Sequence, residues 1–223
     1  MLLKLLKQQL RQHRLRRAGV LDETGPAMEK VGDWVVAPNL VGPESVVHSF
    51  GVGDNVAWDL AMIARFGVTV HAFDPTPASM EWVARQKLPA QFRFHPLGIS
   101  NRDGELLFYP PRRAGTTHYS QDRRGGSLPP VAGQVRRLAT IARDLGHNHI
   151  DILKLDVEGS EFDAVPDLLA SGIPVEQLLV EIHYHFPTRS FGQGLALIRQ
   201  IKAQGYACRY VSPRGYEFAF VRK

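Results

Sequence analysis

The sequence has a single cysteine, Cys208, among its 223 residues. One thiol excludes an internal disulfide framework and a zinc site built from several cysteines, and it is typical of a reducing compartment. Long apolar runs are also missing: no stretch approaches the ~20 residues of a transmembrane helix, and no signal-peptide core is visible. We therefore expect a cytoplasmic protein, and a chain of this length can bury one α/β core.

Acidic residues are absent from positions 1–21, which hold six basic ones: Lys4, Lys7, Arg11, Arg14, Arg16 and Arg17. The whole chain has 27 Lys and Arg against 22 Asp and Glu, a formal net charge of +5. Taking these six from the 27 leaves 21 basic residues against 22 acidic ones, a net charge of −1. Because the rest of the chain is near neutral, it lacks a nucleic-acid footprint, and we expect no nucleic-acid partner.

Residues 1–21 have the pattern of a basic amphipathic helical extension, with leucines beside the basic residues. Three interpretations stay open: the helix packs on the domain or on a second subunit, it lies on a membrane surface, or it is a targeting segment that happens to lack serine. Residues 22–45 are a connecting segment in which Trp34–Val36 form a short strand or a flap beside a ligand. Residues 46–223 make up the main domain.

Residues 46–76 predict a strand, a tight turn, a helix and a second strand. Gly51 and Gly53 break the first apolar run, and Asp54 can cap the helix that follows. The second strand ends at Asp74, which lies 23 residues past Gly51. Glycines let backbone N–H groups approach a ligand, and a carboxylate at this spacing can bind both hydroxyls of a ribose. The pattern indicates a nucleoside-binding fold.

The turn lacks two features of a dinucleotide site. The position of a third glycine holds Val56, and no basic residue is available for a phosphate, which Asp54 would repel. S-adenosylmethionine (SAM), which is cationic at its sulfonium and amino groups and has no phosphate, fits better. The residues that we expect to bind it are Phe50, Gly51, Gly53, Asp54, Asp74, Pro75 and Ser100.

Predicted strands and helices alternate along the rest of the chain, which is typical of a mostly parallel α/β sheet with helices on both faces. A turn signal at Pro213 separates two final strands and adds an antiparallel hairpin strand. The expected strands cover residues 92–99, 106–109, 149–157, 177–185, 206–211 and 216–221, and the expected helices cover 77–86, 135–146, 161–170 and 191–204.

Residues 110–134 form a long insert with four prolines and four glycines, which is either a functional lid or a disordered segment. Its four arginines are Arg112, Arg113, Arg123 and Arg124. We expect them to be solvated charges, and recruitment of an anionic substrate is the alternative.

Charged side chains interrupt two strands that should be buried on both faces. Lys154 and Asp156 share a face of the predicted strand 149–157, and burying a lysine is costly unless it is paired, with Asp156 as the obvious neighbour. Glu181 and His183 follow on the next strand. Because parallel strands end at one edge of the sheet, we expect these residues to converge as catalytic groups.

Two mechanisms are compatible with this set of residues. Asp156 with Glu181 or His183 can bind Mg²⁺, which would activate an acceptor hydroxyl. Alternatively, His183 takes the proton directly as a general base. Because Mg²⁺ prefers oxygen ligands and the set includes an imidazole, we favour the mechanism without a metal.

The segments SFGVGDN, HAFDPTP and IDILKLDVEGSE together resemble the FkbM-type SAM-dependent methyltransferases over roughly residues 34–190. This resemblance implies a class I methyltransferase (Rossmann-like) fold and O-methylation of a hydroxyl on a sugar or small natural product. It also implies that Glu158 and Glu161 belong to the second motif. One departure is Ser49, where the family is often acidic, so the methionine amino group must be bound elsewhere, by Asp54 or Asp59.

Two rival functions remain. A nicotinamide-dependent oxidoreductase would use a similar fold, but the sequence lacks the third glycine and a recognisable catalytic Tyr/Lys pair. A non-catalytic scaffold would have no reason to keep charges inside its sheet. The expected partner is therefore a small-molecule or glycan acceptor, with attachment to a membrane surface or a subunit contact through the N-terminal helix as an open addition.

Overall fold

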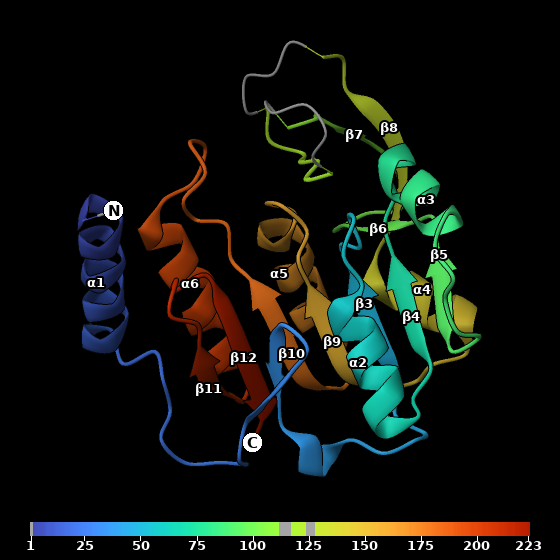
Figure 1. Ribbon diagram of the computed structural model, residues 1–223. Helices are drawn as coiled ribbons and strands as arrows, with labels where there is room; N and C mark the ends of the chain where they lie inside the picture. The colour runs from blue at the N-terminus through green and yellow to red at the C-terminus, as the bar shows by residue number, and fades with distance from the viewer. Residues whose placement is uncertain (1, 112–116, 124–127) are drawn as a thin grey trace.

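The computed structural model describes residues 2–111, 117–123 and 128–223. A seven-stranded sheet with the order β11-β12-β10-β9-β3-β4-β5 forms its centre (Figure 1). The strands are β3 (Val47–Phe50), β4 (Val70–Phe73), β5 (Phe92–His95), β9 (Ile150–Leu155), β10 (Val175–Glu181), β11 (Tyr206–Val211) and β12 (Glu217–Arg222). The five strands from β5 to β10 pair in parallel, and β12 is antiparallel to both its neighbours. This confirms the predicted Rossmann-like sheet with its C-terminal antiparallel hairpin strand.

Helices cover both faces of the sheet (Figure 1). One face packs against α2 (Ala57–Phe66) and α3 (Pro77–Ala84), and the other against α4 (Leu138–Leu145), α5 (Glu161–Ser171) and α6 (Phe191–Ala203). Central strands are therefore apolar on both sides: in β9, Ile152 packs on the α2 side, while Leu153 and Leu155 pack on the other. Polar residues in these strands are the exceptions that need an explanation.

A second, three-stranded sheet stands beside the first and consists of β6 (Gly98–Ile99), β8 (Val131–Arg136) and β7 (Gly104–Phe108). The single strand predicted over residues 92–99 is therefore wrong. It divides at Pro96, which has no N–H to continue a ladder, into β5 and β6 in different sheets. The helix predicted from residue 135 is also corrected, because β8 occupies the end of the insert and α4 begins only at Leu138.

Two more boundaries differ at the ends of the central strands. Helix α2 begins at Ala57, and the side-chain oxygen that accepts the Ala57 N–H belongs to Asn55 rather than to Asp54. Strand β10 ends at Glu181, where the chain turns so that the N–H of Phe186 reaches the carbonyl of His183. His183 therefore lies in a loop and does not continue a strand face with Glu181.

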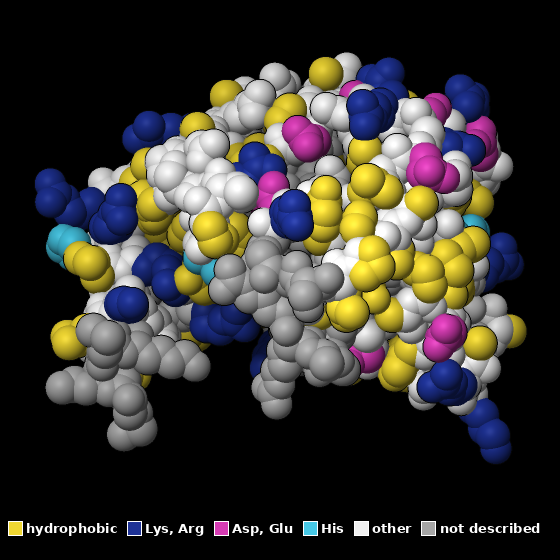
Figure 2. All heavy atoms as spheres, turned by 90° about the horizontal axis from the view of Figure 1, so that it is seen from above, with side chains coloured by type: hydrophobic (Ala, Val, Ile, Leu, Met, Phe, Trp, Pro, Cys, Tyr) yellow, Lys and Arg dark blue, Asp and Glu magenta, His cyan; other side chains and the backbone are white. Residues whose placement is uncertain are grey.

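The N-terminal helix α1 (Leu2–Arg17) lies beside α6 and the C-terminal hairpin (Figure 1). Leu15 is buried there, and the guanidinium groups of Arg11 and Arg14 lie 4.0 Å from the ring centre of Tyr216 and 3.8 Å from that of Phe191. Figure 2 shows Lys and Arg side chains gathered at this end of the molecule. In the structure α1 packs on the domain, which is one of the arrangements that the sequence left open.

The connecting segment forms a hairpin of β1 (Glu29–Val31) and β2 (Trp34–Val36), followed by a 3₁₀ turn at Pro38–Leu40. Trp34 and Val36 pack with α2 on one face of the large sheet. The short strand at Trp34–Val36 is thus confirmed, whereas its partner β1 was not predicted. Within the described residues, none of the helices is long and apolar enough to cross a membrane.

Candidate active site

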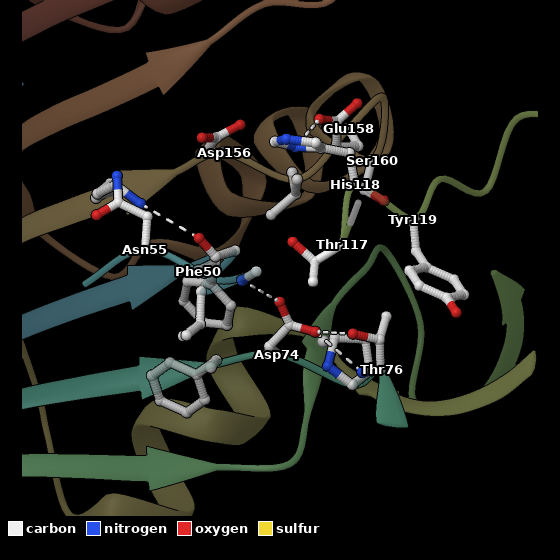
Figure 3. A pocket seen from close by; sticks show the side chains of 18 of the residues that line it. Phe50, Asn55, Asp74, Thr76, Thr117, His118, Tyr119, Asp156, Glu158 and Ser160 are labelled. Atoms are coloured by element: carbon white, nitrogen blue, oxygen red, sulfur yellow. Dashed lines mark hydrogen bonds and ion pairs between the residues drawn. The ribbon is translucent and has the colours of Figure 1, made fainter. Parts of the chain in front are cut away.

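A cleft opens at the carboxyl edge of the large sheet, where β3, β4 and β9 end (Figure 3). It encloses about 890 Å³ of space when its open mouth is counted, and concave clefts of this kind are where small molecules usually bind. The labelled side chains of Asp74, Thr117 and Asp156 surround this space. Ligands of open α/β sheets bind at this edge, so the cleft is the candidate active site.

The turn after β3 requires both of its glycines. Gly51 and Gly53 have φ values of 89° and 54°, in the left-handed region that other residues rarely adopt. A Cβ on Gly51 would lie 1.7 Å from the carbonyl oxygen of Asp156, so β3 and β9 approach too closely here for any side chain. The resulting turn exposes backbone to the cleft in front of α2.

Asp74 follows β4 and is buried in the floor of the cleft. One carboxylate oxygen accepts the N–H of Gly53 at 3.0 Å, and the other accepts the N–H and hydroxyl of Thr76 at 3.0 Å and 2.6 Å. These bonds hold the carboxylate in one orientation, and the oxygen bonded to Gly53 can still accept another donor. Asp74 therefore has the position and the remaining capacity that a ribose contact needs.

Lys154 is buried on the α2 side of β9. Its Nζ lies 5.3 Å and 6.0 Å from the ring centres of Trp34 and Trp58, and 3.5 Å from the carbonyl oxygen of Gly51. The predicted ion pair with Asp156 does not form within 4.0 Å in the described part of the chain, because the ammonium turns toward the indole rings instead.

Asp59 on α2 is buried and lines the cleft on the same side as Lys154. Burial raises the pKa of Asp59, while the Lys154 ammonium and the Ser49 hydroxyl oppose that rise. Ser49 pairs with Lys154 across β3 and β9 and is itself buried. A carboxylate from α2 thus reaches the neighbourhood of Ser49 and Lys154.

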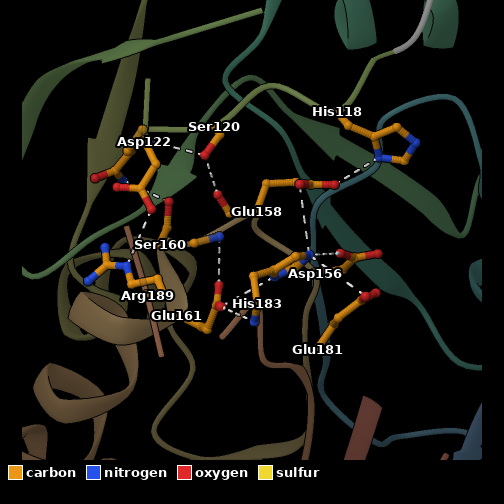
Figure 4. Close-up of polar contacts among 12 residues, drawn as sticks. His118, Ser120, Asp122, Asp156, Glu158, Ser160, Glu161, Glu181, His183 and Arg189 are labelled. Atoms are coloured by element: carbon orange, nitrogen blue, oxygen red, sulfur yellow. Dashed lines mark hydrogen bonds and ion pairs between the residues drawn. The ribbon is translucent and has the colours of Figure 1, made fainter. Parts of the chain in front are cut away.

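His183 lies at the centre of a group of carboxylates beside the cleft (Figure 4). Its Nε2 is 3.8 Å from a carboxylate oxygen of each of three residues: Asp156, Glu158 and Glu181. On the other side of the ring, Nδ1 is 3.2 Å from Oε1 of Glu161, which also accepts the backbone N–H of His183 at 2.7 Å. Three of the four predicted catalytic residues therefore converge, and Lys154 lies apart.

The charges of this group perturb one another strongly. Burial alone would lower the pKa of His183, but the carboxylates of Glu161, Glu158 and Glu181 outweigh it and raise this pKa to about 10. Burial, together with the nearby Asp156, raises the pKa of Glu181 to about 7, and burial also raises the pKa of Asp156. An imidazole that keeps its proton at neutral pH is a poor general base, which speaks against the mechanism in which His183 acts alone.

Part of the long insert covers the cleft. Three of its residues line the space: Thr117, His118 and Tyr119. The segment is held by the hydroxyl of Ser120, which donates to the carbonyl of Glu158 at 2.6 Å, and by Gln121, which donates to the hydroxyl of Ser160 at 2.8 Å. The lid interpretation therefore fits residues 117–123. Arg112, Arg113 and Arg124 lie outside the described residues, so their suggested contact with an anionic substrate stays a prediction.

Most of the predicted cofactor residues meet at the cleft. The lining includes Phe50, Gly51, Gly53, Asp54, Asp74 and Pro75, together with Trp34 and Asp59. Ser100 is buried but does not line the cleft. Its backbone N–H donates to the carbonyl oxygen of Arg136. The insert residues Thr117 to Tyr119 were missed as individual contacts, since a loop between two sheet strands has no periodicity that shows which of its side chains point inward.

The fold and the cleft define a Rossmann-like protein with a candidate ligand site at the end of its central strands. The model of the methyltransferase FkbM domain matches residues 45–208, and the chain belongs to this family. The predicted resemblance is thereby confirmed; the match begins at residue 45 rather than 34 and continues beyond residue 190.

Two related proteins give the same indication. A probable methyltransferase-like protein 24 from Rattus norvegicus is 29% identical over 185 residues, covering 78% of this chain and 44% of the rat protein. The Homo sapiens protein of the same name is 30% identical over 144 residues, covering 63% of this chain and 33% of the human protein. The chain thus spans less than half the length of these relatives. No solved structure matches it.

Proposed function

We propose that this chain is a SAM-dependent methyltransferase that binds SAM in the cleft, with Asp74 on the ribose hydroxyls. The observation that carries the proposal is the charge of the cleft. Six acidic residues line it, and Lys154 is the single Lys or Arg among the described lining residues. The acids are Asp33, Asp54, Asp59, Asp74, Asp156 and Glu158. Such a lining favours a cationic ligand without phosphates and disfavours a dinucleotide.

The polar groups of the cleft also fit a nucleoside cofactor. Trp58 Nε1 and Thr117 Oγ1 are buried and have no hydrogen-bond partner among the described residues, and both side chains line the cleft. Buried polar groups are rarely left unpaired, so these two are candidates for contacts with a ligand. The left-handed backbone of Gly51 and Gly53 forms the turn that brings backbone groups to the cleft, where a ligand can reach them.

We assign the methionine end of SAM to the acidic side of the cleft that faces α2. Asp59 lies there beside Ser49, and Asp54 stands at the exposed mouth. Either carboxylate could accept the amino group, as the sequence suggested. Asp59 is the stronger candidate because a buried carboxylate interacts more strongly with a cation than an exposed one does.

The reaction that we propose is methylation of a hydroxyl on a small molecule or a glycan. SAM supplies an electrophilic methyl group on a positively charged sulfur. The acceptor oxygen loses its proton and bonds to the methyl carbon, and the electron pair of the broken carbon–sulfur bond stays on sulfur. Asp156 and Glu158 line the cleft, so the group around His183 stands where that proton must be removed and the oxygen oriented.

Calorimetric titration with SAM and with NAD tests the cofactor assignment. We expect SAM to bind, and Asp74→Asn to weaken it about 10- to 100-fold, since a hydrogen bond to a charged group contributes about 1.5–3 kcal/mol. Thr76→Val is the matched control, because it removes one bond to Asp74 but keeps the carboxylate. Binding of NAD without binding of SAM would overturn the proposal in favour of an oxidoreductase.

The acceptor needs a separate experiment, since the scaffold interpretation also predicts cofactor binding. Incubating the protein with cell extract and methyl-labelled SAM should transfer label to an extract component and release S-adenosylhomocysteine. Asp156→Asn should lower that transfer by at least about 100-fold while keeping SAM affinity. Binding of SAM with no transfer to any extract component would favour a scaffold.

A further inference from the structure

The imidazole of His183 is held in the orientation of a metal ligand. Glu161 is fully buried and accepts three donors: the backbone N–H groups of Gly159 and His183, at 2.9 Å and 2.7 Å, and Nδ1 of His183 at 3.2 Å. Because a carboxylate accepts, Nδ1 carries a hydrogen, and Nε2 faces the opposite side, where a metal ion would replace its proton. Histidines that bind metals are commonly oriented by a carboxylate on their second nitrogen in this way.

Nε2 of His183 points into a space bounded by carboxylates (Figure 4). The side chain is 3% exposed, and Nε2 makes no hydrogen bond to the described residues, since its nearest carboxylate oxygens, on Asp156, Glu158 and Glu181, are all 3.8 Å away. That distance is too long for a hydrogen bond to a carboxylate. A buried nitrogen aimed at three oxygens that it does not reach leaves room for something between them.

The separations match those between ligands of one ion. Two ligands at about 2.1 Å from an octahedral cation lie between about 3.0 Å and about 4.2 Å apart, depending on their angle. One ligand atom from each of Asp156, Glu158 and His183 falls within 4.8 Å of the others, and the 3.8 Å distances from Nε2 lie inside the octahedral range. The 4.8 Å limit exceeds the octahedral maximum of about 4.2 Å, so binding one cation at the common centre would draw the three side chains slightly together.

We propose that Asp156, Glu158 and His183 bind one divalent cation of the Mg²⁺ or Mn²⁺ type, with Glu181 as an adjacent carboxylate that balances its charge. Carboxylate oxygens predominate, which suits these hard ions, and the single imidazole makes Mn²⁺ the better probe. Binding needs only these residues. The role of the ion rests on the function proposed above: at the edge of the cleft it would bind the acceptor oxygen and lower the pKa of its hydroxyl.

A second feature places this site at the reacting end of the cleft. Asp156 and Glu158 line the cleft, and Gly51 of the cofactor turn touches the backbone of Asp156. A cation on these carboxylates is therefore next to the space assigned to the cofactor. The competing interpretation is that a protonated His183 alone neutralises the carboxylates and no metal binds.

Titration of the purified, metal-free protein with Mn²⁺, followed by electron paramagnetic resonance, distinguishes the two. We expect one Mn²⁺ bound per chain, displaced by Mg²⁺, in the absence of SAM. Because the readout uses neither SAM nor an acceptor, it can succeed or fail independently of the proposed function. No saturable binding at millimolar Mn²⁺ would overturn the proposal and leave the imidazolium as the neutralising group.

Variants locate the ion. His183→Asn keeps an amide near the Nδ1 position but removes Nε2, and Glu158→Gln changes a partly buried loop residue; both should weaken Mn²⁺ binding by more than tenfold. Glu161→Gln keeps all three proposed ligands but alters the hydrogen bonds that orient His183 and Gly159, and it should weaken Mn²⁺ binding by about 10- to 100-fold. Glu44→Gln, an exposed carboxylate before β3 at the opposite edge of the sheet, is the matched control and should change nothing.

Thermal melts show whether each variant remains folded. The titration of the wild-type protein is interpretable even where a variant does not fold. Full Mn²⁺ affinity in folded His183→Asn and Glu158→Gln would place the ion elsewhere and overturn the assignment. Loss of binding in Glu44→Gln would do the same, since it would indicate general attraction to surface carboxylates.

Discussion

A cluster of four histidines and the single residue His183 have opposite electrostatic surroundings in this molecule. On the α4 side of the sheet, histidines contact one another: His48 Nε2 is 2.9 Å from His147 Nδ1, and His71 Nδ1 is 3.0 Å from His95 Nε2. At the carboxyl edge, His183 is surrounded by carboxylates instead. An imidazole therefore lies among other imidazoles in one region and among carboxylates in the other.

The difference sets the charge of each group. Burial lowers the pKa of His71 to about 4, helped by repulsion from His95 and His147, and it lowers the pKa of His48 as well. The acids raise that of His183 to about 10. A neutral histidine cluster packs like aromatic residues, with His71 and His95 stacked at 5.2 Å. His183 instead carries a positive charge among carboxylates that lie beside the cleft, and only these residues are expected to matter for the reaction.

The largest effect should come from removing a charge at the carboxyl edge. Asp156→Asn is expected to lower the rate of methyl transfer by about 10²–10⁴-fold, whether Asp156 acts on the proton or on a cation. SAM affinity should stay close to that of the wild type, because Asp156 is assigned to the acceptor side. Steady-state rates with labelled SAM, together with calorimetry, measure both quantities.

His71→Gln is the matched change in the other group. It should leave the rate and the SAM affinity unchanged, since His71 does not line the cleft. An equal loss of rate in the folded His71→Gln protein would remove the distinction between a structural and a functional histidine group.

The next effect is on stability against pH. A histidine whose pKa is lower in the folded state than in the unfolded state stabilises the fold fully above the unfolded pKa, and this contribution is lost as the pH falls. For His71 the window runs from about 6.5 down to about 4. The full shift corresponds to about 3 kcal/mol, and screening by nearby solvent reduces the expected loss to about 1–2 kcal/mol.

Urea unfolding at pH 7.5 and at pH 5 measures this loss. Because carboxylates also titrate toward acid pH, the informative quantity is the difference from His71→Gln, which should show a shallower decline. Identical declines in both proteins would mean that His71 is not buried in its neutral form.

The smallest effect on the site should follow deletion of residues 1–21. Helix α1 contacts Tyr216, whose ring centre lies 4.4 Å from that of His185, so α1 packs behind the His183 group without entering the cleft. We expect SAM affinity to change less than about twofold, and the oligomeric state or attachment to a surface to change instead. Loss of SAM binding in a folded, truncated protein would show that α1 belongs to the active site.

Much of the fold follows from local patterns. The alternation of apolar runs and helical periodicity predicted a strand at each of the seven positions of the large sheet, although it merged β5 with β6, and the hairpin signal at Pro213 predicted the antiparallel strand. Errors fell where tertiary contacts override local preference. Strand β10 looks continuous through His183 in sequence, but the chain turns there and places that side chain among acids from other elements.

The site was predictable where spacing carries the information. Gly51, Gly53 and Asp74 are positioned by strand ends and a turn, and the sequence shows all three. The partners of Lys154 were not predictable in the same way, because Trp34 and Trp58 come from distant segments. The orienting role of Glu161 was not predictable either, because it depends on a tertiary contact with the His183 ring, 22 residues away in the sequence.

The close approach at Gly51 has a consequence for how this enzyme family can vary. The α-carbon of Gly51 lies against the carbonyl of Asp156 with no room for a methyl group. The turn assigned to the methyl donor and the loop assigned to the acceptor therefore meet in a contact that tolerates no side chain at Gly51. A different acceptor is more readily accommodated by substitutions at Thr117 to Tyr119, which line the cleft from the insert, than by a change at this contact.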